Sequence, residues 1–107
     1  MAGCHPNATT VCIGASDDGR TIPAKVGDSV VVELYASQKK YTVARPVSGV
    51  GVLQLEGSGR LGAASLARYR AKRRGSAQLR ASSRPVCRKH LACPQYVVEW
   101  RVTVAVS

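Results

Sequence analysis

The sequence predicts an all-β fold, an immunoglobulin-like β-sandwich of about seven short antiparallel strands stapled by disulfides. From residue 96 to 106, apolar residues occupy every second position, and most of them are β-branched or aromatic. This is the period of a half-buried strand. The chain has no phenylalanine and one methionine, so its core depends on residues such as valine that favour strands. Turn-forming residues recur at roughly ten-residue spacing, as they do in sandwiches.

The first half of the chain contains four short segments with strand character. Thr21–Ala24 is expected at a sheet edge, because Pro23 has no N–H to donate to a central ladder. Residues 30–35 alternate between two faces and form the clearest strand of this half. Residues 41–44 and 50–55 follow as shorter strands, separated by polar and glycine-containing turns.

Residues 61–74 fit two kinds of secondary structure. Their alanine, leucine, arginine and lysine favour a helix by propensity. However, Ala67, Tyr69 and Ala71 alternate with basic residues, as they would in a strand with one basic face. A glycine follows, and residues 77–81 alternate in the same way. Because two alternating runs joined by a short turn are typical of a hairpin, we predict strand.

A chain of 107 residues is long enough for one domain with a single core. We expect residues 19–107 to form this domain. Residues 1–18 are small, polar and turn-forming, and we expect them to be an N-terminal segment tied by a disulfide or anchored by a lipid. No apolar run approaches the roughly 20 residues that a membrane-spanning helix needs. We therefore expect no integral membrane span, and a monomer.

Four cysteines in so short a chain suggest an oxidising compartment and two disulfides. Pairing of sequence neighbours gives Cys4–Cys12 and Cys87–Cys93. The second pair closes a very short loop, which contributes only about 2 kcal/mol through chain entropy. Its main effect would be to fix the shape of that loop.

Two other roles for the cysteines stay open at this point. A zinc site would add His5 and His90, but Cys-x7-Cys and Cys-x5-Cys are not the spacings of structural zinc modules. We therefore predict no metal site and no cofactor. The Ala-Gly-Cys that ends at Cys4 matches the end of a bacterial lipoprotein signal, in which the cysteine becomes the lipidated first residue. Either role of Cys4 predicts a secreted or cell-envelope protein.

The formal net charge is +10 at pH 7, and every charged residue between Gly57 and Val98 is basic. Such a surface binds nucleic acid, another anionic polymer or an acidic protein, or it serves only solubility. The candidate basic patch consists of Arg68, Arg70, Lys72, Arg73 and Arg74. Tyr69 is the only aromatic residue in this stretch, whereas single-strand binders stack bases on several. We therefore rank a polyanion behind a protein as partner.

The sequence offers no catalytic constellation. Its six acidic residues are scattered, and no pair is placed to converge for acid–base chemistry. The cysteines are expected as cystines, and no glycine-rich run precedes a helix to hold a phosphate. We predict that the protein is not an enzyme.

Three predicted loops, at 36–40, 57–62 and 84–94, connect different strand pairs and are expected to gather at one end of the sandwich. Loops on a rigid sandwich are the usual place for recognition. The last loop is bounded by prolines, carries basic residues and would be braced by Cys87–Cys93. Bracing lowers the ordering cost of binding.

Three stretches carry a resemblance to a known family: VGDSVVVEL, ARYRAKRRGSAQLRA, and RP followed by a loop and VVEWRVTVAV. Over residues 19–106 the chain resembles the chagasin-type inhibitors of papain-like cysteine peptidases, which have an immunoglobulin-like fold. It also resembles actinobacterial envelope proteins that share this core. In the inhibitors, three loops form a wedge that blocks the peptidase cleft. They are an Asn-Pro-Thr-Thr-Gly-aromatic loop, a glycine-rich loop and an Arg-Pro-aromatic loop.

The resemblance implies these loop positions: Tyr41 in the first loop, Gly57, Gly59 and Gly62 in the second, and Arg84 with Pro85 in the third. Here ASQKKY stands in place of the first motif, and Val86 follows Arg-Pro where the family has an aromatic residue. The predicted partner-binding residues are Ser37, Gln38, Lys39, Lys40, Tyr41, Gly57, Gly59, Gly62, Arg84, Pro85, Arg88 and Lys89.

The predicted function is a non-catalytic extracellular protein-binding domain. Its specific form would be a chagasin-like inhibitor of papain-like cysteine peptidases that acts through the three-loop wedge. The alternatives are a basic surface module that binds nucleic acid or another anionic polymer, and a purely structural domain of the cell envelope.

Overall fold

The computed structural model describes residues 4–37, 39–86 and 96–107. Within them the chain forms two packed β-sheets, with no α-helix and a single turn of 3-10 helix, η1 (Ala15–Asp17). The all-β sandwich prediction is confirmed. The strands are β1 (Thr10–Gly14), β2 (Thr21–Ala24), β3 (Ser29–Leu34), β4 (Lys39–Tyr41), β5 (Arg45–Ser48), β6 (Leu53–Leu61), β7 (Ala64–Ala71), β8 (Gly75–Pro85) and β9 (Val98–Val106).

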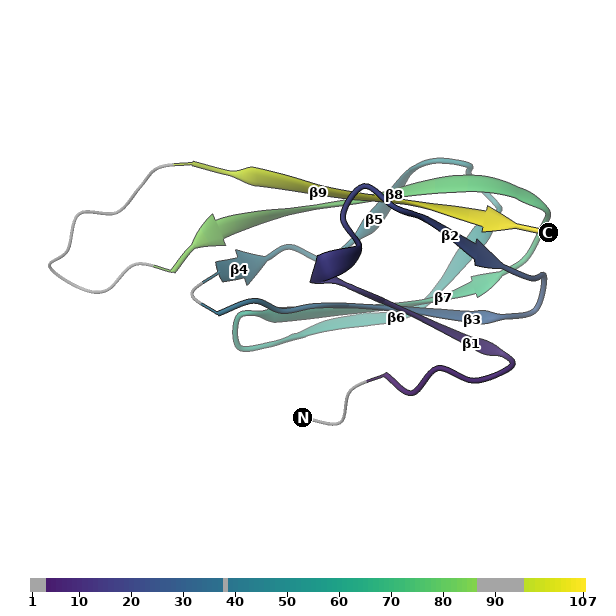
Figure 1. Ribbon diagram of the computed structural model, residues 1–107, viewed down its shortest axis with the longest axis horizontal. Helices are drawn as coiled ribbons and strands as arrows, with labels where there is room; N and C mark the ends of the chain where they lie inside the picture. The colour runs from purple at the N-terminus through teal and green to yellow at the C-terminus, as the bar shows by residue number, and fades with distance from the viewer. Residues whose placement is uncertain (1–3, 38, 87–95) are drawn as a thin grey trace, which may run out of the picture.

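The two sheets divide the chain between them (Figure 1). Sheet A has the strand order β1-β3-β7-β6. Sheet B has the order β2-β9-β8-β4, and β5 pairs with β8 beside β4. The longest strand, β8, therefore carries β9 along one side and both β4 and β5 along the other.

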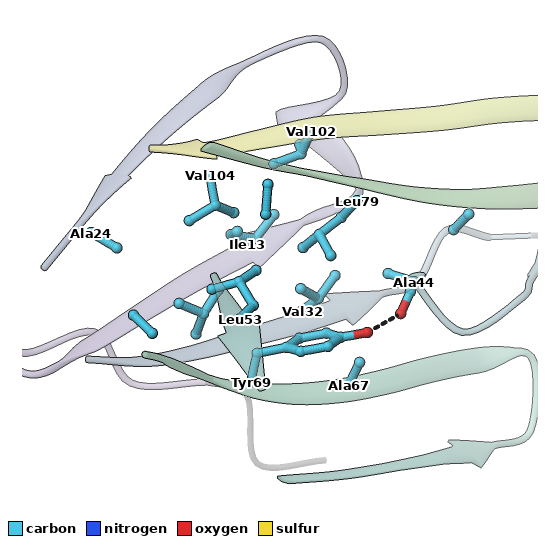
Figure 2. Packing of buried hydrophobic residues seen from close by; sticks show 14 of the residues in the cluster. Ile13, Ala24, Val32, Ala44, Leu53, Ala67, Tyr69, Leu79, Val102 and Val104 are labelled. Carbon is cyan, nitrogen blue, oxygen red and sulfur yellow. Dashed lines mark hydrogen bonds between the residues drawn. The ribbon is translucent and has the colours of Figure 1, made fainter. Parts of the chain in front are cut away.

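The core lies between the sheets and is built from the inward-facing positions of each strand (Figure 2). Leu34 of β3, Tyr69 of β7 and Leu79 of β8 are among its largest fully buried side chains. Trp100 of β9 is also buried. The inward residues are mostly valine, alanine and leucine, and these are the apolar residues that alternate with polar ones in the sequence.

The ambiguous stretch 61–74 contains strand β7, as predicted. Its burial alternates, with Ala67, Tyr69 and Ala71 in the core and Arg68 facing outward. A helix would have placed basic residues on the same side as Tyr69, so burial overrides the helical propensity of the alanines and leucines.

The expectation of purely antiparallel strands is wrong at both N-terminal strands. β1 pairs parallel with β3, from Thr10 opposite Ser29, and β2 pairs parallel with β9, from Thr21 opposite Thr103. Between β1 and β2, the chain crosses from sheet A to sheet B through η1. Each of these strands forms an edge of its sheet and runs parallel to its one neighbour. β1 comes from the segment 1–18, which was expected to lie outside the sandwich.

Other segments also differ from the sequence interpretation. β4 covers Lys39–Tyr41 where a loop at 36–40 and a strand at 41–44 were expected, and β5 at Arg45–Ser48 was not expected. Residues 50–52 form a turn rather than a strand, and β6 runs on through Gly57 and Gly59 to Leu61. The predicted loop 57–62 is therefore wrong for most of its length. β6 pairs with β7 along this stretch, with a bulge between Leu55 and Gly57. β6 is a strand because it pairs with β7, and its own residues do not predict this conformation.

A disulfide joins Cys4 to Cys12 with a Cα–Cα distance of 5.8 Å, as predicted. The Cys4 N–H also donates a hydrogen bond to a carboxylate oxygen of Glu33 in β3, at 3.3 Å. The N-terminal segment is thus fastened to sheet A through side chains as well as through β1. The second predicted disulfide, Cys87–Cys93, lies outside the described residues.

Within the described part of the chain, no helix has the length and apolar character needed to cross a bilayer.

Candidate functional site: the loop end of the sandwich

Strand β4 brings three distant segments of the chain together. Lys39 lies opposite Pro85 and Lys40 lies opposite Arg84 at the end of β8. On its other side, the Tyr41 N–H donates a hydrogen bond to the carbonyl of Ala63 in the β6–β7 turn, at 3.2 Å. The end of β3, the β6–β7 turn and the end of β8 consequently lie at the same end of the sandwich (Figure 1). We call this end, formed by residues 35–37, 61–63, 84–86 and 96–97, the loop end.

Side chains lock β4 in this position. Tyr41 is buried, with 6% of its surface exposed. The Ser65 hydroxyl of β7 is buried too, and it donates a hydrogen bond to the carbonyl of Thr42 at 2.9 Å. Tyr41, predicted to contact a partner, therefore faces the core and anchors the loop end.

The glycines predicted for the second loop are distributed differently. Gly57 and Gly59 lie in the exposed edge strand β6, and only Gly62 sits in the turn. Gly62 has a φ of +61°, a conformation that L-residues other than glycine adopt rarely. It shapes the tight β6–β7 turn, which places the flanking side chains.

Exposed apolar side chains surround the turn and strand ends. Tyr35 is 59% exposed, Leu61 66%, Val86 52% and Tyr96 49%. Tyr35 and Val86 directly follow β3 and β8, Leu61 is the last residue of β6, and Tyr96 lies two residues before β9, so all four lie at strand ends that reach the loop end. Exposed apolar residues grouped on a soluble domain are typical of an interaction site.

A small hollow adjoins this apolar border. It has a volume of about 240 Å³ and lies beside the β6–β7 turn, where Leu61, Ala64 and Leu66 line it. Sequence reasoning did not select Tyr35, Leu61 or Tyr96. They could have been found in the sequence as apolar residues at the junction between a strand and a predicted loop, because the core no longer buries side chains there.

The predicted basic residues of this end are present in part. Lys39, Lys40 and Arg84 lie on β4 and β8 beside it, and Ser37 lies in the turn before β4. Pro85 is paired with β4. Gln38, Arg88 and Lys89 lie outside the described residues.

The predicted basic patch spans a strand and the turn that follows it. Arg68 and Arg70 lie on the outer face of sheet A, whereas Lys72, Arg73 and Arg74 lie in and beside the β7–β8 turn at the far end of β7. Arg70 is engaged by Glu56 at 3.3 Å and by the carbonyl of Gly27 at 2.9 Å.

Arg73 is occupied as well. Its guanidinium donates hydrogen bonds to the carbonyls of Val50 and Gly51, each at 3.3 Å. Two of the five predicted cations, Arg70 and Arg73, therefore bind other parts of the fold.

Burial and ion pairing each shift one pKa in the described part of the chain. Burial raises the pKa of Tyr69 above its ordinary value of 10.0, while the nearby charge of Arg45 acts in the opposite direction. A hydrogen bond from Arg101 lowers the pKa of Glu99, and the charge of Arg80 adds to this effect. Neither group lies at the loop end. Among the described residues, no group of three or more histidine, cysteine or acidic side chains is placed to hold a metal ion.

Comparisons with known proteins show the fold. No family model matches the chain, and no curated protein matches its sequence. A cysteine protease inhibitor from Entamoeba histolytica matches with a TM-score of 0.65 and 8% identity, over 92% of this chain and 95% of its own. Amebosin matches with a TM-score of 0.52 and 13% identity, over 91% of this chain and 97% of its own.

An inclusion body protein from Burkholderia cenocepacia matches with a TM-score of 0.57 and 17% identity. That match covers 79% of this chain and 59% of the other. At such identities the likeness concerns the backbone, so the three structures confirm the predicted immunoglobulin-like fold and carry no activity to this chain.

Proposed function

We propose that this protein is a non-catalytic protein-binding domain that inhibits a papain-like cysteine peptidase with its loop end. The observation that carries the proposal is the convergence of three segments on β4, through the Lys39–Pro85 register and the Tyr41–Ala63 hydrogen bond. The fold that holds them is similar to that of a cysteine protease inhibitor.

The side chains of the loop end are suited to blocking a peptidase cleft and not to catalysing a reaction. Tyr35, Leu61 and Tyr96 offer apolar surface to a cleft, and the basic residues on β4 and β8 add charge at its border. Because β4 is tied to both sheets, the loop end needs little ordering when it binds, and pre-ordered loops lose less entropy. Inhibition then consists of filling the cleft, with no bond made or broken.

The test is a titration of papain and related peptidases with the purified protein, read with a fluorogenic peptide substrate. We expect stoichiometric loss of activity for at least one enzyme. Leu61→Asp should raise the inhibition constant at least about tenfold, which corresponds to about 1.4 kcal/mol of binding free energy. Val50→Asp is the matched control, because Val50 is an exposed apolar residue in the turn before β6, at the opposite end.

Two results would count against the proposal. Lack of inhibition across a panel of papain-like enzymes at micromolar concentration removes the inhibitor role. Inhibition that Leu61→Asp and Val50→Asp weaken equally removes the loop end as its site.

We also propose that the protein works outside the cytoplasm. The Cys4–Cys12 disulfide supports this, because disulfides persist in oxidising compartments. A sulfur in a disulfide carries no lipid, so the same bond favours the disulfide over the lipid at Cys4. The intact mass of the exported protein, measured with and without reduction, tests both statements. A lipid-sized mass increment on the N-terminal peptide would overturn the second.

A further inference from the structure

Three arginines lie side by side on the outer face of sheet B. Arg80 of β8 lies directly opposite Arg45 of β5 on one side and Arg101 of β9 on the other. Residues directly opposite on neighbouring strands point to the same face, with Cβ atoms about 5 Å apart. The sequence separates these residues widely, and only the strand order β5-β8-β9 aligns them.

The row is part of a larger basic face. Arg84 of β8 and Lys40 of β4 lie opposite each other on the same face. Along β8, Ser82 is the outward-facing residue between Arg80 and Arg84. Small polar side chains fill the positions between the cations: Thr42, Gln78, Ser82 and Thr103. Glu99 is the acidic residue that both Arg80 and Arg101 contact, at 3.0 and 2.6 Å. At the β2 side of the row, the Asp18 carboxylate accepts a hydrogen bond from the Arg101 N–H at 2.9 Å.

Like charges opposite each other on a sheet destabilise it. A single exposed carboxylate shared by two arginines compensates this repulsion only in part, and Arg45 is left without an acidic partner among the described ion pairs. An anionic ligand would complete the compensation. Arginine suits this role, because its planar guanidinium forms paired hydrogen bonds with carboxylates, sulfates and phosphates.

The surface is also hollowed where an anion would sit. A depression of about 640 Å³ lies at the side of β8, between β4 and β5. Arg45 and Arg80 line it together with Arg60 from the end of β6 and the carboxylate of Glu99, and Thr42 and Ser82 contribute hydroxyl groups. Three cations thus approach one depression from both sheets.

We propose that this face, formed by Arg45, Arg60, Arg80 and Arg101, binds a linear acidic polysaccharide. Arg45, Arg80 and Arg101 follow one line across the strands, and charged groups of such a polymer also repeat along a line. The face carries no aromatic side chain among its described residues, whereas nucleic-acid binders stack bases on aromatic rings. Exposed apolar residues, which can anchor a protein partner, include Tyr35, Leu61 and Tyr96 at the loop end, whereas Val47 of β5 is exposed beside Arg45.

The experiment measures binding of fluorescently labelled heparin fragments and oligogalacturonates by anisotropy, at low and physiological salt. An oligothymidylate of similar charge is the third probe. We expect both polysaccharides to bind, with an affinity that falls as salt rises because counterions are released. The two polysaccharide probes separate sulfate from carboxylate recognition.

Two variants locate the site. Arg45→Gln with Arg80→Gln should weaken polysaccharide binding at least about tenfold, or about 1.4 kcal/mol, and flatten its salt dependence. The matched control, Arg68→Gln with Lys72→Gln, removes the same charge from other surfaces and should change affinity less than about threefold, or about 0.7 kcal/mol. Glu99→Gln should tighten binding, because it releases Arg80 and Arg101 from their shared carboxylate.

Equal weakening by the two double variants would overturn the proposal, since net charge alone would then explain binding. Absence of binding at low salt would overturn it too, and so would tighter binding of the oligothymidylate than of both polysaccharides. Thermal unfolding confirms that each variant is folded. Peptidase inhibition by Arg45→Gln/Arg80→Gln should stay unchanged, so this inference and the proposed function can fail separately.

Discussion

The outer faces of the two sheets differ in charge although the inner faces are alike. On sheet A, Arg68 and Arg70 share the face with Glu33 and Glu56, and an ion pair joins Arg70 to Glu56. On sheet B, Glu99 pairs with both Arg80 and Arg101 of the row of arginines, and no described ion pair joins Arg45 to an acidic residue. The difference shows that the core fixes only every second position of a strand. The remaining positions are free to carry a function, and sheet B carries the stronger signal.

The largest effects should come from the inner faces and should be equal on the two sheets. Leu34 of sheet A and Leu79 of sheet B are both fully buried. We expect Leu34→Ala and Leu79→Ala each to lower the free energy of unfolding by about 2–5 kcal/mol, because each leaves a cavity. Urea denaturation measures this. Leu66→Ala, at an exposed position of β7, should change stability by less than about 1 kcal/mol. A mild effect at only one of the buried leucines would show that the sheets contribute unequally.

A smaller effect is expected at the polar link between the layers. The Tyr69 hydroxyl of sheet A donates a buried hydrogen bond of 2.7 Å to the carbonyl of Ala44, in the segment that enters β5 of sheet B (Figure 2). Tyr69→Phe leaves that carbonyl without its donor and should cost about 1–3 kcal/mol. Denaturation at neutral pH gives the value. An unchanged stability would mean that water replaces the hydroxyl without loss.

The same tyrosine predicts a pH dependence. Burial raises its folded-state pKa above 10.0, so the folded state favours the protonated phenol. This contribution to stability is complete below the unfolded pKa of about 10 and is lost as the pH rises through the folded value. The wild-type protein should therefore lose stability more steeply than Tyr69→Phe above about pH 10. Parallel alkaline unfolding curves for the two proteins would contradict this.

The smallest effect concerns the outer faces themselves. Glu99→Gln removes the carboxylate that separates Arg80 from Arg101 and should lower Tm slightly at low ionic strength. The loss should vanish at high salt, because surface charges are screened. Glu56→Gln on sheet A should show a weaker salt dependence, since Glu33 stays on that face. Calorimetry over a salt series compares them, and equal salt dependence would contradict the difference between the faces.

Much of the fold could be predicted because it depends on residues that are close together in the sequence. β3, β7, β8 and β9 alternate over most of their length, so most of their inner and outer positions follow from the sequence alone. The Cys4–Cys12 disulfide follows from a short separation in the same way. β1, β5 and β6 were missed or misplaced, because β6 buries only Leu53 and β5 buries no residue. Their strand conformation comes from pairing with β3, β7 and β8.

For the candidate site too, some features could be predicted from the sequence and others could not. Each of the three predicted loops includes residues that meet at the loop end, although most of the predicted loop 57–62 belongs to strand β6. The sequence did not show that Tyr41 is buried while Tyr35 and Leu61 are exposed, because exposure at a strand end depends on where the opposite sheet stops covering it.

By itself the sequence determined the strand-forming alternation, the apolar core and the excess of positive charge, all of which depend on residue type and near-neighbour spacing. Tertiary structure alone decided where that charge is concentrated. The run 68–74 looked like one basic patch but is divided between a sheet face and a turn. Arg45, Arg80 and Arg101 are far apart in the chain and meet in one row. The reason is the register of strands distant in sequence, which is set by hydrogen bonds across the whole sheet.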